Sequence, residues 1–252
     1  MTNESSAAVL DRYVGAAIDQ KLYSNSRNLR RHLHYVFGGI DLRNKDVLDI
    51  GGGAGLLAVY AAVCGARSAV CVEPEGAGAS SNPRAKFARF TRAVDPRMPV
   101  TFVSDTIQSF LQGSRRFDVI VCANAINHLD EQACVHLQGD PAAERQYLSL
   151  FGLIHQATNP AGWFVATDCA RSNFFAALGK KSPFMPDIEW HKHQDPHVWA
   201  ALLARAGFSE TTTKWSAPNT LGGLGRILLS NRIFAYFLLS HFRLSARKPR
   251  DQ

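Results

Sequence analysis

Short apolar runs recur along the chain, separated by polar and glycine-rich segments. They predict strands at residues 47–50, 69–73, 100–103, 117–122, 163–167 and 242–246. A further strand is predicted at 210–215, after the helix-end glycine Gly207. Segments between them have helical periodicity and predict helices at 56–64, 77–93, 142–157 and 196–206. Strands that alternate with helices indicate an open α/β sheet, mostly parallel, with helices on both faces.

Ahead of the first strand, residues 7–38 are predicted to be helical. Leu29, Leu33 and Phe37 recur at spacings of four, and Gly38 follows as a helix end. A helix in this position either covers the mouth of an active site or packs on the core. We therefore expect a single domain over 1–252 that begins with a helical cap at about 7–38.

Two inserts interrupt the regular alternation. Residues 172–194 are irregular and rich in aromatic residues, with Pro183 and Pro186, and long loops of this kind are often functional. Residues 216–240 include an apolar-rich helical stretch at 221–240. We expect this second insert to cover an acceptor pocket, with a core helix as the plain alternative.

The most informative stretch is 47–57, where a buried strand runs into a glycine turn and then a helix. Gly51, Gly53 and Gly55 alternate through the turn, which lets backbone N–H groups approach a bound nucleotide. The spacing also fits the dinucleotide fingerprint G-x-G-x-x-A, which ends here at Ala58. The carboxylate of Asp49 favours a cofactor with a cationic end, because it would repel a pyrophosphate.

An acid also ends the second predicted strand. Glu73 lies about 20 residues beyond the glycines, where a carboxylate commonly accepts hydrogen bonds from ribose hydroxyls. Glu73 therefore supports nucleoside binding for either cofactor.

The order of several motifs along the chain resembles that of the class I S-adenosylmethionine methyltransferases. The resemblance rests on the Asp49-x-Gly51-x-Gly53-x-Gly55 segment, Glu73, Asp105, Asn127-His128 and Ala206-Gly207-Phe208. It implies a Rossmann-like, doubly wound sheet of seven strands that ends in an antiparallel strand. It also implies a turn at 159–162, before the fifth strand.

The same resemblance implies S-adenosylmethionine as the cofactor. The glycines would lie under its methionine part, Asp49 near the ammonium group and Glu73 at the ribose. The remaining cofactor-binding candidates are Asp105 and Thr106 at the adenine, and Asn124 and Asn127 at the methyl-donor pocket.

Three histidines are candidates for a general base, which a hydroxyl acceptor requires. His191 and His193 lie in the first insert and would point the same way if the backbone were extended, with Asp168 or Glu189 as orienting carboxylates. His128 follows the fourth strand and is ranked after this pair. Residues 189–197 hold three histidines, but no other ligand cluster accompanies them, so no metal is expected.

The cysteine content and the lack of long apolar runs indicate the class of protein and its location. Five cysteines without a C-x-x-C pair favour buried, reduced thiols and a cytoplasmic location. No signal peptide is expected at the N-terminus, and no apolar run is long enough to span a membrane.

The net charge of +7 is concentrated near the C-terminus. Residues 211–250 hold seven lysines and arginines and no acidic residue. Such a stretch suits an anionic acceptor, weak peripheral membrane contact through 221–240, or a solubilising surface. No Asn-Pro-Pro-Tyr-like segment follows the fourth strand, which argues against nucleic acid as the acceptor.

These observations predict O-methylation of a small-molecule or sugar-like acceptor with a histidine base. One alternative is an NAD-dependent oxidoreductase, although no Tyr-x-x-x-Lys motif follows the fourth strand. The other is a non-catalytic, methyltransferase-like binding subunit. The sequence leaves the oligomeric state open.

Overall fold

The structure is a computed structural model that describes residues 6–75, 81–217 and 229–250. Within these ranges lie seven strands, β1 (Asp46–Ile50), β2 (Ser68–Val72), β3 (Val100–Val103), β4 (Phe117–Ala123), β5 (Thr158–Cys169), β6 (Ser209–Trp215) and β7 (His241–Arg247). They are hydrogen-bonded in the order β3-β2-β1-β4-β5-β7-β6. β1 is parallel to β2 and β4, and β2 to β3, whereas β7 is antiparallel to β5 and β6. The predicted fold class is confirmed.

Helices occupy most of the segments between the strands. They are α1 (Ser6–Asp19), α2 (Ser26–Phe37), α3 (Leu56–Val63), α4 (Pro83–Val94), α5 (Ile107–Phe110), α6 (Glu131–His136), α7 (Pro141–Ala157), α8 (Phe174–Ala177), α9 (Pro196–Arg205) and α11 (Arg232–Phe237). Two short 3₁₀ segments are η1 (Ile126–His128) and η2 (Trp190–Lys192). The helices predicted at 56–64, 142–157 and 196–206 are confirmed. The one predicted at 77–93 begins at Pro83, and residues 76–80 lie outside the described ranges.

The segment predicted to be helical over 7–38 forms two helices, α1 and α2, with a break between them. Lys21 takes a φ of 55°, which ends α1. Asn25 then starts α2, since its side chain accepts a hydrogen bond from the Asn28 N–H at 2.9 Å. This N-cap interaction outweighs the helical periodicity that runs through the break.

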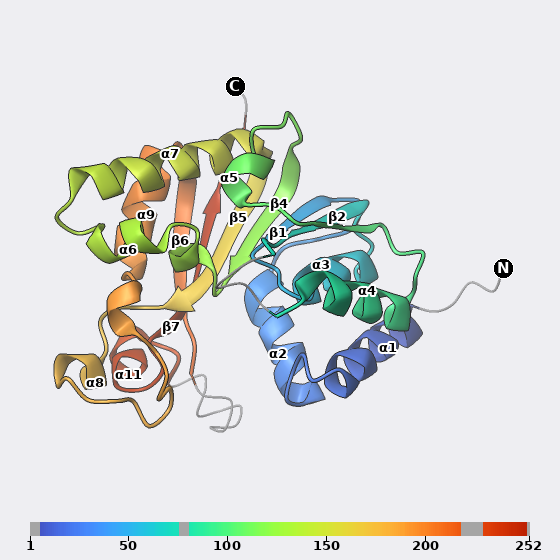
Figure 1. The fold of residues 1–252 in the computed structure, drawn as a ribbon, viewed down its shortest axis with the longest axis horizontal. Helices are drawn as coiled ribbons and strands as arrows, with labels where there is room; N and C mark the ends of the chain where they lie inside the picture. Colours follow the sequence, from blue (N-terminus) through green and yellow to red (C-terminus); the bar gives the residue numbers. More distant parts are fainter. Residues whose placement is uncertain (1–5, 76–80, 218–228, 251–252) are drawn as a thin grey trace. The chain divides into compact units, whose positions relative to one another are not determined.

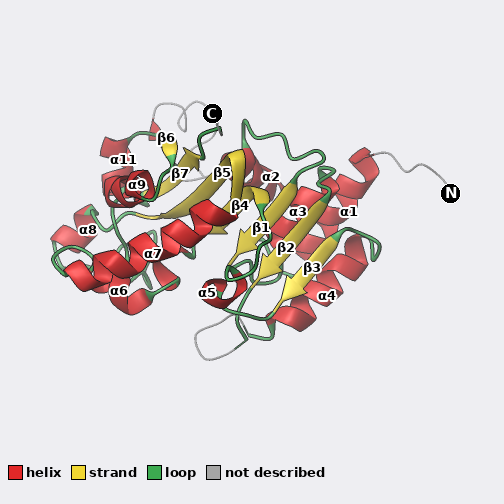
Figure 2. Ribbon diagram, turned by 90° about the horizontal axis from the view of Figure 1, so that it is seen from above, coloured by secondary structure: helices red, strands yellow, loops and turns green. Residues whose placement is uncertain are grey.

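The described chain divides into two compact units. Unit 1 is 1–123 with 157–159, and unit 2 is 124–156 with 160–252. In unit 1, α1 packs against α2, α3 and α4, and α3 packs on β1 and β2 (Figure 1). Tyr13 is fully buried there and donates to the Leu56 carbonyl at 2.9 Å, which joins α1 to the start of α3. Figure 2 shows α1 and α4 alongside each other in this unit.

In unit 2, β7 lies between β5 and β6, and α9 packs on β6 and β7. The core includes the fully buried rings of Tyr147, Phe151 and Trp199. The alternation of Phe242, Leu244 and Ala246 predicted β7, but Arg243 and Ser245 are buried as well. A central strand is covered on both faces, so its polar positions are buried with its apolar ones.

Residues 159–162 differ from their predicted structure, and part of the predicted helix at 221–240 is not described. Residues 159–162 do not form a separate turn, because β5 already begins at Thr158. The backbone of Ala161, with a φ of 59°, donates to the Lys248 carbonyl and so keeps this irregular segment in the sheet. In the predicted helix at 221–240, residues 221–228 lie outside the described ranges, and the described remainder contains α11.

The five cysteines form no disulfide in the described structure, and four of them are buried, with Cys64 half-buried. This confirms the predicted buried thiols. None of the helices in the described ranges has the length and apolarity that a membrane span requires.

Candidate functional site

The glycine turn after β1 has the backbone conformation that its sequence predicts. Gly51, Gly53 and Gly55 have φ values of 65°, 55° and 79°, in the left-handed region. A Cβ atom on Gly55 would lie 2.3 Å from the Phe87 ring. Glycine is therefore required at Gly55 both for conformation and for space.

Glu73, one residue beyond β2, holds this turn. Its carboxylate is buried and accepts a hydrogen bond from the Gly53 N–H at 3.1 Å. Sequence reasoning placed Glu73 at the ribose, and the structure shows that it also fixes the turn.

Asp49 is buried beneath the same turn, with 1% of its surface exposed. Its Oδ2 atom accepts a hydrogen bond from the Ala58 N–H at 3.1 Å, whereas Oδ1 has no partner in the described structure. Burial raises the pKa of Asp49 to about 7; the Ala58 hydrogen bond opposes this rise and the charge of Glu73 adds to it. A buried oxygen without a donor is costly, and a ligand ammonium group would satisfy it. The site thus fits the cationic end that the sequence predicted.

Asp105 and Thr106 follow β3. Asp105 accepts a hydrogen bond from the Thr106 N–H at 2.7 Å, and the Thr106 hydroxyl accepts one from the Ser109 N–H at 3.3 Å as the N-cap of α5. Both contacts shape the loop at the end of β3, and the predicted adenine contact stays a prediction.

The remaining candidates lie in unit 2. Asn124 has a φ of 53°, and its Oδ1 atom accepts from the Thr167 hydroxyl at 3.4 Å and lies 3.1 Å from His241 Nε2. It therefore joins the segment after β4 to β5 and β7. Asn127 is buried, and its Oδ1 atom has no partner within the described residues.

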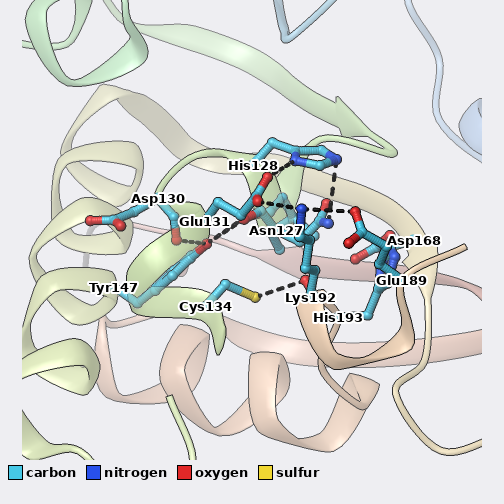
Figure 3. Close-up of polar contacts among 11 residues, drawn as sticks. Asn127, His128, Asp130, Glu131, Cys134, Tyr147, Asp168, Glu189, Lys192 and His193 are labelled. Atoms are coloured by element: carbon cyan, nitrogen blue, oxygen red, sulfur yellow. Dashed lines mark hydrogen bonds and ion pairs between the residues drawn. The ribbon is translucent and has the colours of Figure 1, made fainter. Parts of the chain in front are cut away.

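A histidine and a carboxylate form a pair at the end of β5 (Figure 3). His193 Nδ1 lies 3.0 Å from Asp168 Oδ1, and their side chains are 13% and 3% exposed. Neither His193 Nε2 nor Asp168 Oδ2 has a hydrogen bond within the described part of the chain. The carboxylate can hold the Nδ1 proton, which leaves Nε2 free to accept another.

His191 and His193 would point the same way only if the backbone were extended, and this condition is not met. Residues 190–192 form the 3₁₀ turn η2 instead of an extended segment, with the His193 N–H donating to the Trp190 carbonyl. His191 is consequently exposed, while His193 turns to Asp168. His128 is also exposed, and its Nδ1 atom lies 3.0 Å from a Glu131 oxygen.

Sequence reasoning missed the contacts that hold η2. Lys192 forms ion pairs of 2.8 Å with both Glu131 and Glu189. The Cys134 thiol donates to the Lys192 carbonyl at 3.3 Å, and burial raises the pKa of Cys134 to about 12, which keeps the thiol protonated. Gln194, fully buried, donates to the Cys134 carbonyl at 2.6 Å. Only the Glu189–Lys192 spacing was visible as a signal, because the other partners are distant in sequence.

The predicted residues therefore fall into two sets. Unit 1 brings together Asp49, the glycine turn and Glu73, with Asp105 and Thr106 on the neighbouring strand end. Unit 2 brings together His193 with Asp168, and Asn127 with His128. Among the residues that the structure describes, no group of three metal-binding side chains is found.

Comparisons with known proteins agree on one family. A family model described as a methyltransferase domain matches residues 22–213. An S-adenosylmethionine-dependent methyltransferase from Mesorhizobium loti aligns over 91% of this chain and 100% of its own, at 17% identity and a TM-score of 0.58. No curated protein sequence matches the chain significantly.

Two further solved structures are similar in fold. An O-methyltransferase family protein from Burkholderia thailandensis aligns over 90% of this chain and 57% of its own, at 14% identity and a TM-score of 0.57. SMU.776, a putative methyltransferase solved in complex with SAH, aligns over 86% of this chain and 48% of its own, at 11% identity and a TM-score of 0.55.

Proposed function

Because the chain belongs to the methyltransferase domain family, we propose that it transfers a methyl group from S-adenosylmethionine to a hydroxyl group of a small-molecule acceptor. The pair of His193 and Asp168 is the observation that carries the choice of a hydroxyl. A hydroxyl must lose its proton when it is methylated, and an oriented histidine can accept it.

The residues of unit 1 suit the cofactor. The bound sulfonium would supply an electrophilic methyl group, and the protein would contribute binding and alignment. Asp49 Oδ1 would accept a hydrogen bond from the ammonium group, and Glu73 and Asp105 would contact the ribose and the adenine. Support comes from the unpartnered Oδ1 atom and from the SAH in the SMU.776 structure.

His193 is the proposed general base. Its Nε2 atom would take the acceptor proton, while Asp168 holds the Nδ1 proton and stabilises the imidazolium that forms. Asn124 and Asn127, which follow β4, are proposed to contact the cofactor near its methyl group. His128 ranks after His193 as a base because it is exposed. His191 is left out of this role because it is exposed, whereas His193 contacts Asp168.

The family match sets aside the NAD-dependent oxidoreductase. The non-catalytic binding subunit is the remaining alternative. It would bind S-adenosylhomocysteine and turn over no hydroxylated acceptor, whereas the proposed enzyme does both.

Alanine variants of the histidines test the base. We expect His193→Ala to keep its affinity for S-adenosylhomocysteine and to lose about 10²–10⁴ in turnover. His191→Ala is the matched control, since it removes a neighbouring imidazole that is exposed. The measurement is S-adenosylhomocysteine release across a library of hydroxylated small molecules. Near wild-type turnover of His193→Ala would show that alignment alone drives the reaction.

A further inference from the structure

A cavity of about 650 Å³ opens in unit 2 between the start of α9, the end of β6 and α11. The site described above does not include it. Three of its lining residues carry aromatic rings, Trp215 from β6 and Tyr236 and Phe237 from α11. Flat apolar walls of this kind suit a ring system, which can stack on them.

The rings in these walls are supported from behind. Phe174 of α8 contacts Phe237, with ring centres 5.2 Å apart, and Tyr236 at 6.4 Å. Trp215 packs against the buried Phe242 at 6.1 Å. Trp215 is therefore anchored to the core of unit 2, and Tyr236 and Phe237 are held against the half-buried Phe174 of α8.

The cavity contains two charged groups, and only one lacks a partner. Asp195 accepts hydrogen bonds from the Ser172 N–H at 2.9 Å and from the Ser172 hydroxyl at 2.5 Å, so both of its oxygens are used. Arg232 is exposed and forms no ion pair or hydrogen bond with the residues that the structure describes. An exposed guanidinium without an ion-pair partner can bind a carboxylate through two parallel hydrogen bonds.

The cavity lies at the same end of the strands as the pair of His193 and Asp168. Cys169, which follows Asp168, is opposite His241 in the β5–β7 register. Trp215 is opposite the next residue, Phe242, in the β6–β7 register. Asp195, in the cavity wall, is two residues from His193.

We propose that this cavity binds the body of the methyl acceptor, and that the acceptor is a flat aromatic molecule with a carboxylate held by Arg232. Trp215, Tyr236 and Phe237 enclose the ring system. The identification with the acceptor rests on the proposed function, whereas binding of an aromatic carboxylate does not.

Calorimetry with matched probes tests the chemistry. Wild-type protein is titrated with 2-naphthoate, with neutral 2-naphthamide, and with cyclohexanecarboxylate, which keeps the charge but lacks the flat rings. We expect 2-naphthoate to bind at least about tenfold more tightly than either of the others, as a charge-assisted contact and ring stacking together imply. Equal affinity for 2-naphthoate and 2-naphthamide, or no binding of 2-naphthoate, would overturn the proposal.

Variants assign the binding to this cavity. Arg232→Gln should remove the preference for the carboxylate, Arg232→Lys should keep part of it, and Trp215→Leu should weaken both naphthyl probes. Arg145→Gln on α7 is the control, because Arg145 is exposed and outside the cavity. A preference that survives Arg232→Gln in a folded variant contradicts the assignment.

The same samples are titrated with S-adenosylhomocysteine. Failure of the cofactor with intact 2-naphthoate binding would contradict the proposed function and leave the cavity assignment standing. Binding of S-adenosylhomocysteine without binding of 2-naphthoate would contradict the cavity assignment alone.

Discussion

Asp49 is the residue whose surroundings most clearly call for a ligand. One carboxylate oxygen is held by the Ala58 N–H, and the other is buried without a partner among the described residues. Burial raises its pKa to about 7, so the side chain titrates in a range where binding can be measured. Only the ionised form attracts an ammonium group, and protons therefore compete with the cofactor below that pH.

The first prediction follows from this competition. The affinity for S-adenosylhomocysteine should be constant above about pH 8 and fall by about tenfold per unit below pH 7, as linkage to one proton requires. Asp49→Asn should bind weakly at all pH values and lose this dependence. Calorimetry between pH 6 and 8.5 measures both, and a wild-type affinity that stays constant below pH 7 would contradict the role of Asp49.

At the residue scale, the sequence could identify Asp49 and Glu73 because each ends a predicted strand. It could not choose between His191 and His193, since that choice depends on whether residues 190–192 are extended or form a 3₁₀ turn. The turn is stabilised by Lys192, whose two carboxylate partners include Glu131, far away in the sequence.

At the scale of elements, the apolar runs predicted β1, β2, β4 and β7 because these strands are mostly buried in the sheet. The edge strands β3 and β6 were also predicted, although they are only partly buried. The errors lie where local contacts override periodicity. Lys21 and Asn25 divide the predicted N-terminal helical segment into two helices, and a hydrogen bond to the Lys248 carbonyl holds Ala161 in β5. Neither contact leaves a periodic signal.

The glycine turn gives the second prediction. Gly55→Ala should lower the free energy of unfolding by about 1–3 kcal/mol, because it places a Cβ atom against Phe87 at a positive φ. Gly15→Ala is the control, since no atom lies within 4 Å of a Cβ there. Within helix α1 the control should stabilise the protein by about 0.5–1 kcal/mol. Urea denaturation compares the two, and equal stability of Gly55→Ala and the wild type would refute the tight fit.

At the scale of the whole molecule, part of the C-terminal basic stretch is used internally. Arg247 lies 3.7 Å from a Glu210 oxygen and over the Trp163 ring, Lys248 donates to the His155 carbonyl, and Arg243 is buried. The large apolar side chains that remain exposed in the described ranges include Ile233, Phe234 and Phe237 of α11. Because several basic residues are used inside the protein, we predict that contact with an anionic membrane surface is weak.

Vesicle flotation tests this third prediction. We expect binding to anionic vesicles at low salt, its loss at about 0.15 M salt through screening, and no binding to neutral vesicles. Binding that survives salt would instead show insertion of the apolar α11 surface. The predicted covering of an acceptor pocket by 216–240 stays a prediction, since part of that stretch lies outside the described residues.

The central claim is that this methyltransferase-family chain uses S-adenosylmethionine, and direct calorimetry of the wild-type protein with S-adenosylhomocysteine at pH 8 tests it most simply. We predict saturable binding at one site per chain, with the affinity lost in Asp49→Asn. A folded wild-type protein that gives no binding response would contradict the claim.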